Sequence, residues 1–307
     1  MRTVTLTKET TKDILENLLK RSPNQYGSYE TAVREILAKI QEEGDGALFA
    51  YTKKFDRAEI TEQNVRVTDE EIREAYETVD PALVDVIRKS LVNIRSYHEK
   101  QKQNSWFTSS EDGTMLGQKV TPLEKVGVYV PGGKAVYPSS VLMNIVPAKV
   151  AGVDRIIMTT PPGPDGKVNP STLVAANEAG ADEIYKAGGA QAIGALAYGT
   201  QSIPKVDKIV GPGNIFVALA KKAVYGHVSI DSIAGPSEIL VLADDSANPR
   251  FVAADLLSQA EHDELASAIL ITTSRELAEK VSCEVDEFVK RLSRKEIIQK
   301  SLDQFGY

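Results

Sequence analysis

Two side chains of types that bind metal ions, Gln259 and His262, stand three positions apart in the segment "LLSQAEHDE" at residues 256–264. The sequence predicts a helix here, and residues three apart share a helix face. An amide oxygen and an imidazole nitrogen on one face would supply half of a zinc site, which usually takes three protein ligands or more. The competing interpretation is a solvated helix face, which is the commoner origin of such a pair.

The rest of the chain offers few partners for such an ion, because it contains three histidines and one cysteine. His98 continues the apolar stripe of a predicted helix and is interpreted as a packed or half-exposed residue. His227 is interpreted as a strand-end residue. Asp255 precedes Gln259 by four positions on the same face, but carboxylates on helices commonly serve the helix dipole or a cap.

Composition indicates a globular protein. A length of 307 residues with 42% hydrophobic content suffices for one large or two ordinary domains. The net charge is −7, and no basic stripe of the kind that binds a phosphate backbone is present, so no nucleic-acid partner is expected. The start lacks a signal peptide and no run of about eighteen apolar residues occurs, so we expect no membrane partner and a cytoplasmic location.

The only cysteine, Cys283, excludes an internal disulfide framework and a cysteine-based zinc cluster. It lies off the apolar stripe of an amphipathic helix and far from any Gly-rich loop. A nucleophilic thiol is therefore not expected.

The apolar pattern places mainly helices before residue 126 and alternating strands and helices after it. "TDEE" at 68–71 is a capping box, and Pro81 stands in the first turn of a long helix. Short apolar runs then alternate with helical stretches, as in βαβ units on a parallel sheet. The strand candidates are "VGVYV", "RIIMTT", "EIYKAG", "KIVG", "EILVLAD" and "AILITT".

The predicted fold class is α/β, with two Rossmann-like parallel-sheet layers, an N-terminal helical arm, and a second layer that is incomplete at the C-terminus. Residues 1–25 form the arm. Residues 26–125 together with 236–307 form a discontinuous first α/β domain, because the early helices have too few strands of their own. Residues 126–235 form an inserted Rossmann-like domain.

The segment "IVGPGNIF" at 209–216 invites a dinucleotide interpretation. Gly211 and Gly213 lie between a strand and a helix, but Phe216 occupies the last glycine position of the G-x-G-x-x-G fingerprint. The strand "RIIMTTPPG" also lacks a following acid for a ribose hydroxyl. Tight turns and cofactor contacts therefore explain these glycines, and those of "VPGG", about equally well.

Several long motifs nevertheless resemble those of the histidinol dehydrogenase family. They are "VGVYVPGGKAVYPSSVLMNIVPAKVAGV", "GGAQAIGALAYGT", "KIVGPGN", "SIDSIAGPSEILVLAD" and "AADLLSQAEHDE", in that order along the whole chain. The resemblance implies an NAD-dependent, zinc-assisted oxidation of L-histidinol through the aldehyde to L-histidine, in histidine biosynthesis. It also implies a homodimer.

The resemblance assigns site residues by matching positions. The family's zinc ligands that also touch the substrate match Gln259 and His262, and Ser237 matches a further substrate contact. The NAD contacts match Tyr129, Gln191 and Asn214.

The family's other zinc ligands and its Glu-His acid/base pair are expected beyond residue 307, so no catalytic residue is assigned here and this chain is expected to be inactive. The end of the sequence agrees with truncation. Ser293 and Glu296 read as a capping box, Gly306 as the stop of that helix, and Tyr307 as the start of a further strand.

Two other interpretations stay open from the sequence. One is a binding-only α/β protein or pseudoenzyme. The other is an unrelated Rossmann-like module that binds a nucleotide or a sugar.

Overall fold

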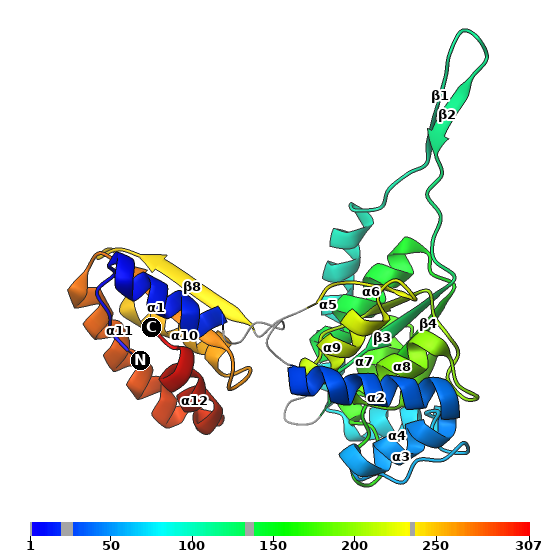
Figure 1. The fold of residues 1–307 in the computed structure, drawn as a ribbon, viewed down its shortest axis with the longest axis horizontal. Coiled ribbons are helices and arrows are strands. Elements are labelled where there is room, and N and C mark those ends of the chain that lie inside the picture. The colour runs from blue at the N-terminus through cyan, green and yellow to red at the C-terminus, as the bar shows by residue number, and fades with distance from the viewer. Residues whose placement is uncertain (1, 20–26, 133–137, 234–236) are drawn as a thin grey trace. The chain divides into compact units, whose positions relative to one another are not determined.

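The computed structural model of the chain divides into two compact units. It describes residues 2–19, 27–132, 138–233 and 237–307. The large unit comprises residues 28–233, and the small unit comprises residues 1–27 with 234–307 (Figure 1). Each has its own sheet and its own hydrophobic core.

A parallel sheet of five strands forms the centre of the large unit. Its spatial order is β5-β4-β3-β6-β7, so the strand order reverses between the neighbours β3 and β6. The central strands are almost entirely buried, as parallel strands covered on both faces should be. The strands are β3 (Lys125–Tyr129), β4 (Arg155–Thr160), β5 (Glu183–Lys186), β6 (Lys208–Val210) and β7 (Ser229–Ile230).

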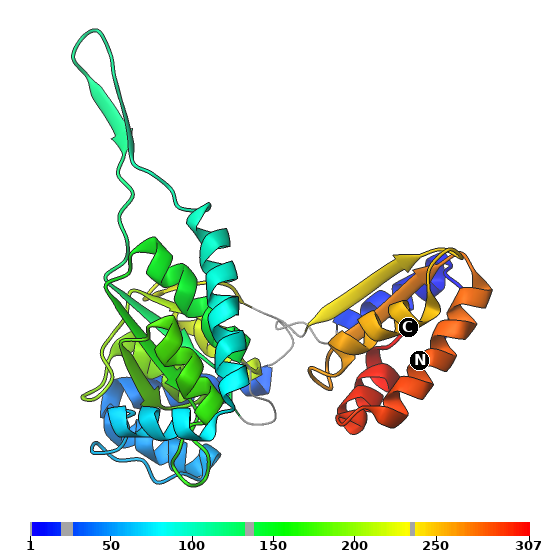
Figure 2. The ribbon, with the colours of Figure 1, turned by 180° about the vertical axis from the view of Figure 1, so that it is seen from behind.

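Helices cover both faces of this sheet (Figure 2). Helices α4 to α7 pack together over a core that includes the fully buried Ile145, Ile156 and Met158. Helices α2, α3, α8 and α9 form a second packed group. Their bounds are α2 (Gly27–Glu43), α3 (Asp45–Asp56), α4 (Asp69–Thr78), α5 (Pro81–Glu99), α6 (Pro138–Ala151), α7 (Pro170–Ala179), α8 (Gly189–Tyr198) and α9 (Ile215–Val224).

Residues 65–67, which precede the sheet in the sequence, are hydrogen-bonded to its edge strand β5. The amide of Val67 donates to the carbonyl of Ile184 at 2.9 Å, and the amide of Lys186 donates to the carbonyl of Val65 at 2.8 Å. The predicted capping box is present at the start of α4. These bonds make the early helices part of the large unit.

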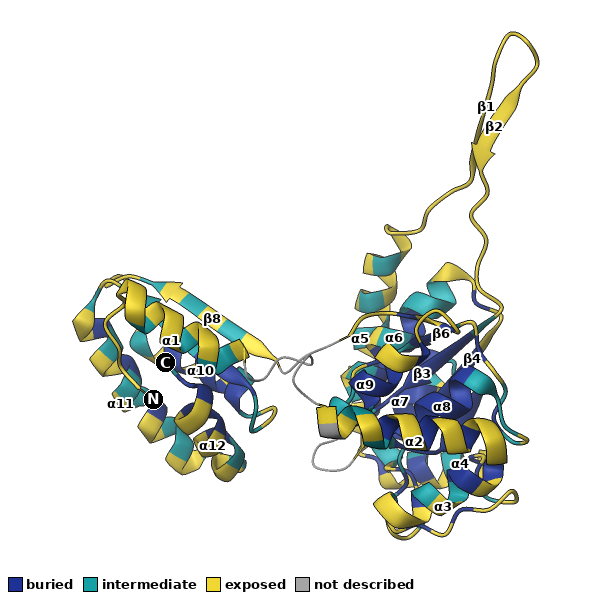
Figure 3. Ribbon diagram, viewed as in Figure 1, coloured by how far each residue is buried: buried dark blue, intermediate teal, exposed yellow. Residues whose placement is uncertain are grey.

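A two-stranded antiparallel hairpin interrupts the chain between α5 and β3. Its strands are β1 (Trp106–Ser109) and β2 (Met115–Gln118), and every residue in them is exposed. Figure 3 shows the hairpin as one exposed ribbon that extends away from the helices and sheet of the large unit.

The small unit is built on two parallel strands, β8 (Glu238–Ala243) and β9 (Ser267–Thr272). The last two residues extend this sheet, because the amide of Tyr307 donates to the carbonyl of Ala268 at 3.0 Å and its carbonyl accepts from the amide of Leu270 at 2.8 Å. This pairing is an isolated bridge between Gly306 and Ala268, so the start of a strand at Tyr307 stays a prediction. The predicted capping box at Ser293 is absent. The helix that follows, residues 295–305, has Arg294 as its N-cap residue, and Arg294 makes no side-chain capping bond.

Three helices pack together and against the sheet of the small unit. The N-terminal helix contacts the chain's end, because Asn17 donates to the hydroxyl of Tyr307 at 3.1 Å. Leu240 and Leu242 of β8 are 57% and 77% exposed. The three packed helices are α10 (Pro249–Ala260), α11 (Arg275–Arg291) and α12 (Lys295–Phe305), and the N-terminal helix is α1 (Lys8–Leu19).

The α/β class and the two parallel sheets are confirmed. The expected domain boundaries differ from the observed division, which groups residues 28–125 with 126–233 and not with 236–307. The reason is physical: the apolar faces of α4 and α5 are buried against α6 and α7. Residues 1–19 belong with the small unit instead of forming a separate arm.

Candidate functional site

The carboxyl edge of the large unit's sheet carries the candidate dinucleotide site. In an open α/β sheet, ligands bind outside the carboxyl ends of the strands where the strand order reverses, which here lies between β3 and β6. Tyr129 ends β3, Gln191 lies in the first turn of α8, and Asn214 immediately precedes α9. The fold therefore brings residues that are 85 positions apart in the chain to one edge.

Tyr129 is 3% exposed, and its hydroxyl accepts a hydrogen bond from the amide of Gly189 at 3.2 Å. Burial raises the pKa of Tyr129 to about 12. The phenol is therefore neutral at physiological pH and retains a proton that it can donate to a ligand oxygen.

Gln191 is 1% exposed and lies three residues into α8 counted from Gly189. Its amide oxygen folds back over the start of the helix, because a Cβ added at Gly189 would lie 2.7 Å from it. A helix N-terminus presents unpaired amide groups and a partial positive charge, which favour anions such as a pyrophosphate.

Asn214 is the N-cap residue of α9. Its side-chain oxygen accepts from the amides of Phe216 at 3.1 Å and Val217 at 3.2 Å. Because the oxygen is engaged by the helix, the opposite end of the side-chain amide presents its two donors away from the helix start.

An ion pair between a buried lysine and an exposed aspartate holds the loop between β6 and α9. Lys221, which is 3% exposed, donates to the carbonyl of Gly211 at 2.9 Å and forms an ion pair with Asp231. Asp231 in turn accepts from the amide of Gly211 at 2.8 Å. Gly211 has φ of 119°, and a Cβ there would lie 2.0 Å from the carbonyl oxygen of Tyr129. Only glycine allows this close approach of the two loops.

Asp56, the last residue of α3, acts on the same phenol through its charge. Its charge adds to the effect of burial on the pKa of Tyr129. Among the residues described, its buried Oδ2 atom has no hydrogen-bond partner, and burial raises the pKa of Asp56 to about 6. A buried carboxylate oxygen without a donor suits a ligand hydroxyl.

The candidate substrate and metal residues all lie in the small unit, at the amino ends of its strands. Ser237 directly precedes β8, and its carbonyl accepts from the amide of Ser267 at 3.1 Å. Gln259 is half-buried near the end of α10, whereas His262 lies in the turn after the helix, which ends at Ala260. The amide of His262 still donates to the carbonyl of Gln259 at 3.1 Å, and the shared face of the two side chains stays a prediction.

Among the described residues, no group of three or more His, Cys, Asp or Glu side chains could hold a metal ion. Gln259 and His262 are suitable donor types, but two donors do not complete a zinc site. Asp255 is exposed on α10, and its carbonyl accepts from the Ser258 hydroxyl at 2.7 Å.

The remaining singled-out residues fit structural interpretations. His98 is half-buried at the end of α5, and its Nδ1 lies 2.7 Å from the side-chain oxygen of Gln101. His227 is exposed in the turn before β7. Cys283 is exposed on α11.

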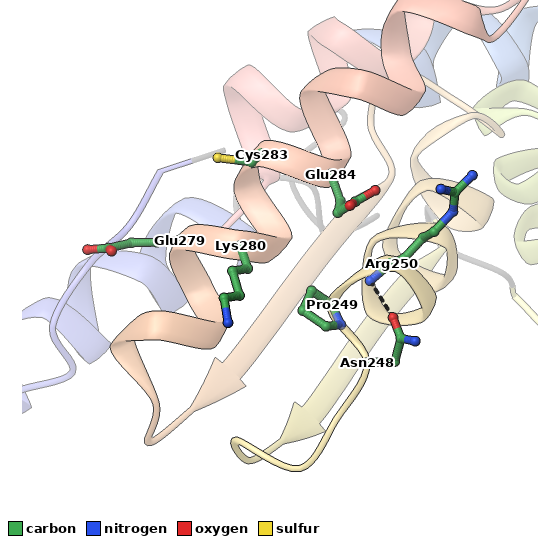
Figure 4. Close-up of a pocket in the computed structure, with 7 residues that line it drawn as sticks. All are labelled: Asn248, Pro249, Arg250, Glu279, Lys280, Cys283 and Glu284. Carbon is green, nitrogen blue, oxygen red and sulfur yellow. Dashed lines mark hydrogen bonds between the residues drawn. The ribbon is translucent and has the colours of Figure 1, made fainter.

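A shallow groove lies between the start of α10 and the outer face of α11. Figure 4 shows Pro249 and Arg250 across from Lys280 and Glu284. None of the predicted site residues lines it. Gly133 of the "VPGG" turn falls outside the described residues.

Asp56, Lys221 and Asp231 were missed by sequence reasoning. Asp231 carried a weak signal, because an acid directly follows a strand at the sheet's carboxyl edge. Nothing in the sequence pairs it with a lysine ten residues upstream, because that contact depends on how α9 packs.

Among the described residues, no helix has the length and apolar character needed to cross a membrane.

Comparisons with known proteins show which family the chain resembles. The family model described as histidinol dehydrogenase matches residues 19–307. The chain is 57% identical to the histidinol dehydrogenase of Halalkalibacterium halodurans over 277 residues, which cover 90% of this chain and 65% of that protein. It is 58% identical to that of Aquifex aeolicus over 292 residues, covering 95% of this chain and 67% of that protein.

A solved structure of histidinol dehydrogenase from Elizabethkingia anophelis matches with a TM-score of 0.83 at 39% identity. The match covers 100% of this chain and 66% of that one. The chain thus spans about 65% of the length of the curated relatives that it matches.

Proposed function

Because this chain belongs to the histidinol dehydrogenase family, we propose that it carries the NAD-binding part and half of the zinc and substrate site of an L-histidinol dehydrogenase. The reaction is the two-step oxidation of L-histidinol through the aldehyde to L-histidine in histidine biosynthesis. The observation that supports this most directly is the gathering of Tyr129, Gln191 and Asn214 at the switch point of the large unit's sheet.

The residues at that edge fit a dinucleotide. NAD, when bound, accepts the hydride in each oxidation step. Tyr129 and the amide of Asn214 would donate to its oxygens, and the start of α8 beside Gln191 would take the pyrophosphate. Asp56 offers the acceptor for a ribose hydroxyl that the end of β4 lacks.

Gln259 and His262 would contribute two zinc ligands, and Ser237 would bind the polar end of the substrate. In the family, the remaining zinc ligands and the Glu-His acid/base pair lie in the part of the relatives that this chain does not cover. General acid/base groups contribute roughly two to four orders of magnitude in rate, so we expect no turnover from the 307-residue chain. NADH formation from L-histidinol by this chain would contradict that.

We also propose that the enzyme is a cytoplasmic homodimer with no nucleic-acid or membrane partner, in keeping with the family and the net charge of −7. The competing idea of a nucleotide- or sugar-binding module unrelated to this family is excluded by the identities above. A binding-only member of the family is the remaining alternative.

The NAD site can be tested by titration calorimetry with two matched variants. Asn214→Ala should weaken NAD binding by about tenfold or more, because it removes both the donors and the cap of α9. Asn169→Ala is the control: Asn169 caps α7 in the same way, with its oxygen accepting from the amide of Ser171 at 2.9 Å. Its loss should cost similar stability and leave NAD affinity unchanged. Equal effects on NAD binding would show that Asn214 acts only as a cap.

The metal site has its own readout. The 307-residue chain should bind Zn²⁺ weakly or not at all, because two neutral donors leave the other positions to water. In a chain extended to the length of the relatives, His262→Ala should lower zinc affinity strongly, and Asp255→Ala should change it little. An effect of Asp255 as large as that of His262 would mean that the ligands are wrongly assigned.

A further inference from the structure

The hairpin β1–β2 carries large apolar side chains on both of its faces. Successive strand residues point to opposite faces, so Trp106 and Leu116 lie on one face, and Phe107 and Met115 lie on the other. These side chains are between 55% and 67% exposed. An isolated two-stranded hairpin is marginally stable in water, and both outer edges still offer backbone hydrogen bonds. Such a hairpin needs a covering partner.

Two of the apolar side chains make contacts within the hairpin. The indole of Trp106 donates to the side-chain oxygen of Gln118 at 3.3 Å. The ring of Phe107 lies over Gly117, where an added Cβ would approach Cδ1 of the ring to 2.4 Å. Neither contact removes the apolar surface from water.

Charge is distributed unevenly along the hairpin. The acidic residues Glu111 and Asp112 lie at its tip, whereas at its base the three lysines Lys100, Lys102 and Lys119 outnumber the single acid Glu99. Bonds from the backbone and side chain of Thr114 lower the pKa of Asp112, which keeps the tip negative.

This arrangement is complementary to itself in one orientation. When two copies of the hairpin lie side by side and point in opposite directions, each acidic tip meets the basic base of the other copy. When they point in the same direction, like charges meet. A two-fold axis perpendicular to the hairpins produces the first arrangement, whereas an axis parallel to them would produce the second.

We propose that the β1–β2 hairpin is a contact surface for a second copy of this chain, with the two hairpins antiparallel about a two-fold axis. The proposal rests on the homodimer proposed above and names the surface that forms it. The apolar residues supply the buried contact, and the charges at tip and base fix the direction.

Charge reversal tests the direction. The tip variant is E111K/D112K, and the base variant is K102E/K119E. All four positions are exposed, so the variants should keep the fold of the large unit; D112K also removes the turn bond from Thr114, and the base variant, which removes none of the turn bonds, is the cleaner test. Sedimentation equilibrium at low salt should show a dimer for the wild-type chain and a dissociation constant raised about tenfold or more for each variant alone.

An equimolar mixture of the two variants should return to the wild-type affinity, because each tip then meets a base of opposite charge. A mixture that stays monomeric would overturn the proposal, as would variants that dimerise normally. A partner of another kind, such as a different protein, predicts a monomeric wild-type chain, which also counts against it.

The chain contains one tryptophan, Trp106, so its fluorescence reports on this surface alone. Dimerisation through the hairpin should shift its emission to shorter wavelength as the concentration rises. A dimer with unchanged emission would show that the chain associates through another surface. The homodimer and the NAD site would then stand, and the hairpin assignment would not.

Discussion

The two sheets of the molecule differ in how their strands are covered. In the large unit, β4 is buried at every position from Ile156 to Thr160, and β5 is buried throughout. In the small unit, β8 alternates between half-buried and exposed positions, and Leu240 and Leu242 are among the exposed ones.

The difference shows that an apolar strand sequence does not by itself fix burial. "RIIMTT" and "EILVLA" are both apolar runs in parallel pairs, which normally have both faces covered. The large unit supplies a layer of helices on each face. In the small unit the core packs on the side of Ile239 and Val241. The same type of substitution should therefore have very different costs in the two units.

The largest expected effect comes from truncating one leucine in each unit. Leu196 in α8 is fully buried and packs against Gly127 of β3, so Leu196→Ala should cost about 2 to 5 kcal/mol. Leu242→Ala is the matched change at a position that is 77% exposed, and it should stay within about 0.5 kcal/mol.

Urea titrations followed by circular dichroism measure both effects, with each unit analysed as its own transition if two appear. A cost for Leu242→Ala close to that of Leu196→Ala would break the comparison. It would mean that the outer face of β8 is covered in solution.

Local patterns predicted six of the strands well because each depends on a short apolar run, whereas the hairpin strands β1 and β2 were not predicted. "RIIMTT" matches β4 residue for residue, and the other strand candidates match within two residues. The assignment of the early helices failed because an amphipathic helix shows which face is buried but not which partner buries it. The pairing of residues 65–67 with β5, which settles the partner, has no local signature.

The candidate site likewise contains residues that the sequence predicts and one that it does not. The loops that carry Tyr129, Gln191 and Asn214 follow from the order of strands and helices. The orphan carboxylate of Asp56 comes from a helix outside the βαβ units, and its position depends on the packing of α3 against α8. Only the folded chain brings it to this edge.

An intermediate effect is expected for two aspartates whose pKa values move in opposite directions. Burial raises the pKa of Asp56 in the large unit to about 6 from a usual value near 3.8. The folded state therefore holds a proton that the unfolded state releases, and stability falls as the pH rises from about 4 to 6. Asp56→Asn should gain on the order of 1 to 2 kcal/mol at pH 7, after allowance for the water that still reaches the group.

Asp244 in the small unit is the contrasting control. Hydrogen bonds from the side chain and backbone of Ser246 lower its pKa. Its contribution is present above the unfolded pKa and is lost as the pH falls through the lower, folded value. Asp244→Asn should therefore lose a little stability at neutral pH. Urea midpoints measured from pH 4 to 8 decide the matter: an unchanged pH profile for Asp56→Asn would show that this carboxylate is solvated.

The smallest expected effect separates two identical sequence patterns, one in each unit. "TDEE" at 68–71 and "SRKE" at 293–296 both fit the capping-box pattern. Only the first forms it: the amide of Glu71 donates to the Thr68 hydroxyl at 3.3 Å, and the amide of Thr68 donates to the Glu71 carboxylate at 3.0 Å.

Thr68→Ala should therefore lower the free energy of unfolding by about 1 kcal/mol. Thr68→Ser should retain most of that stability, because a serine hydroxyl also accepts from the N3 amide. In the Thr68→Ala variant Glu71 still forms its ion pair with Lys186, whose Nζ lies 2.6 Å from the Glu71 carboxylate. The lost stability therefore reports the capping bond of Thr68 alone. Ser293→Ala should change stability by less than about 0.5 kcal/mol, because α12 starts at Lys295 with Arg294 at its N-cap. Urea titrations of the three variants give the costs. If Ser293→Ala proves as costly as Thr68→Ala, then Ser293 caps α12 in solution, and the two units follow the same local rule after all.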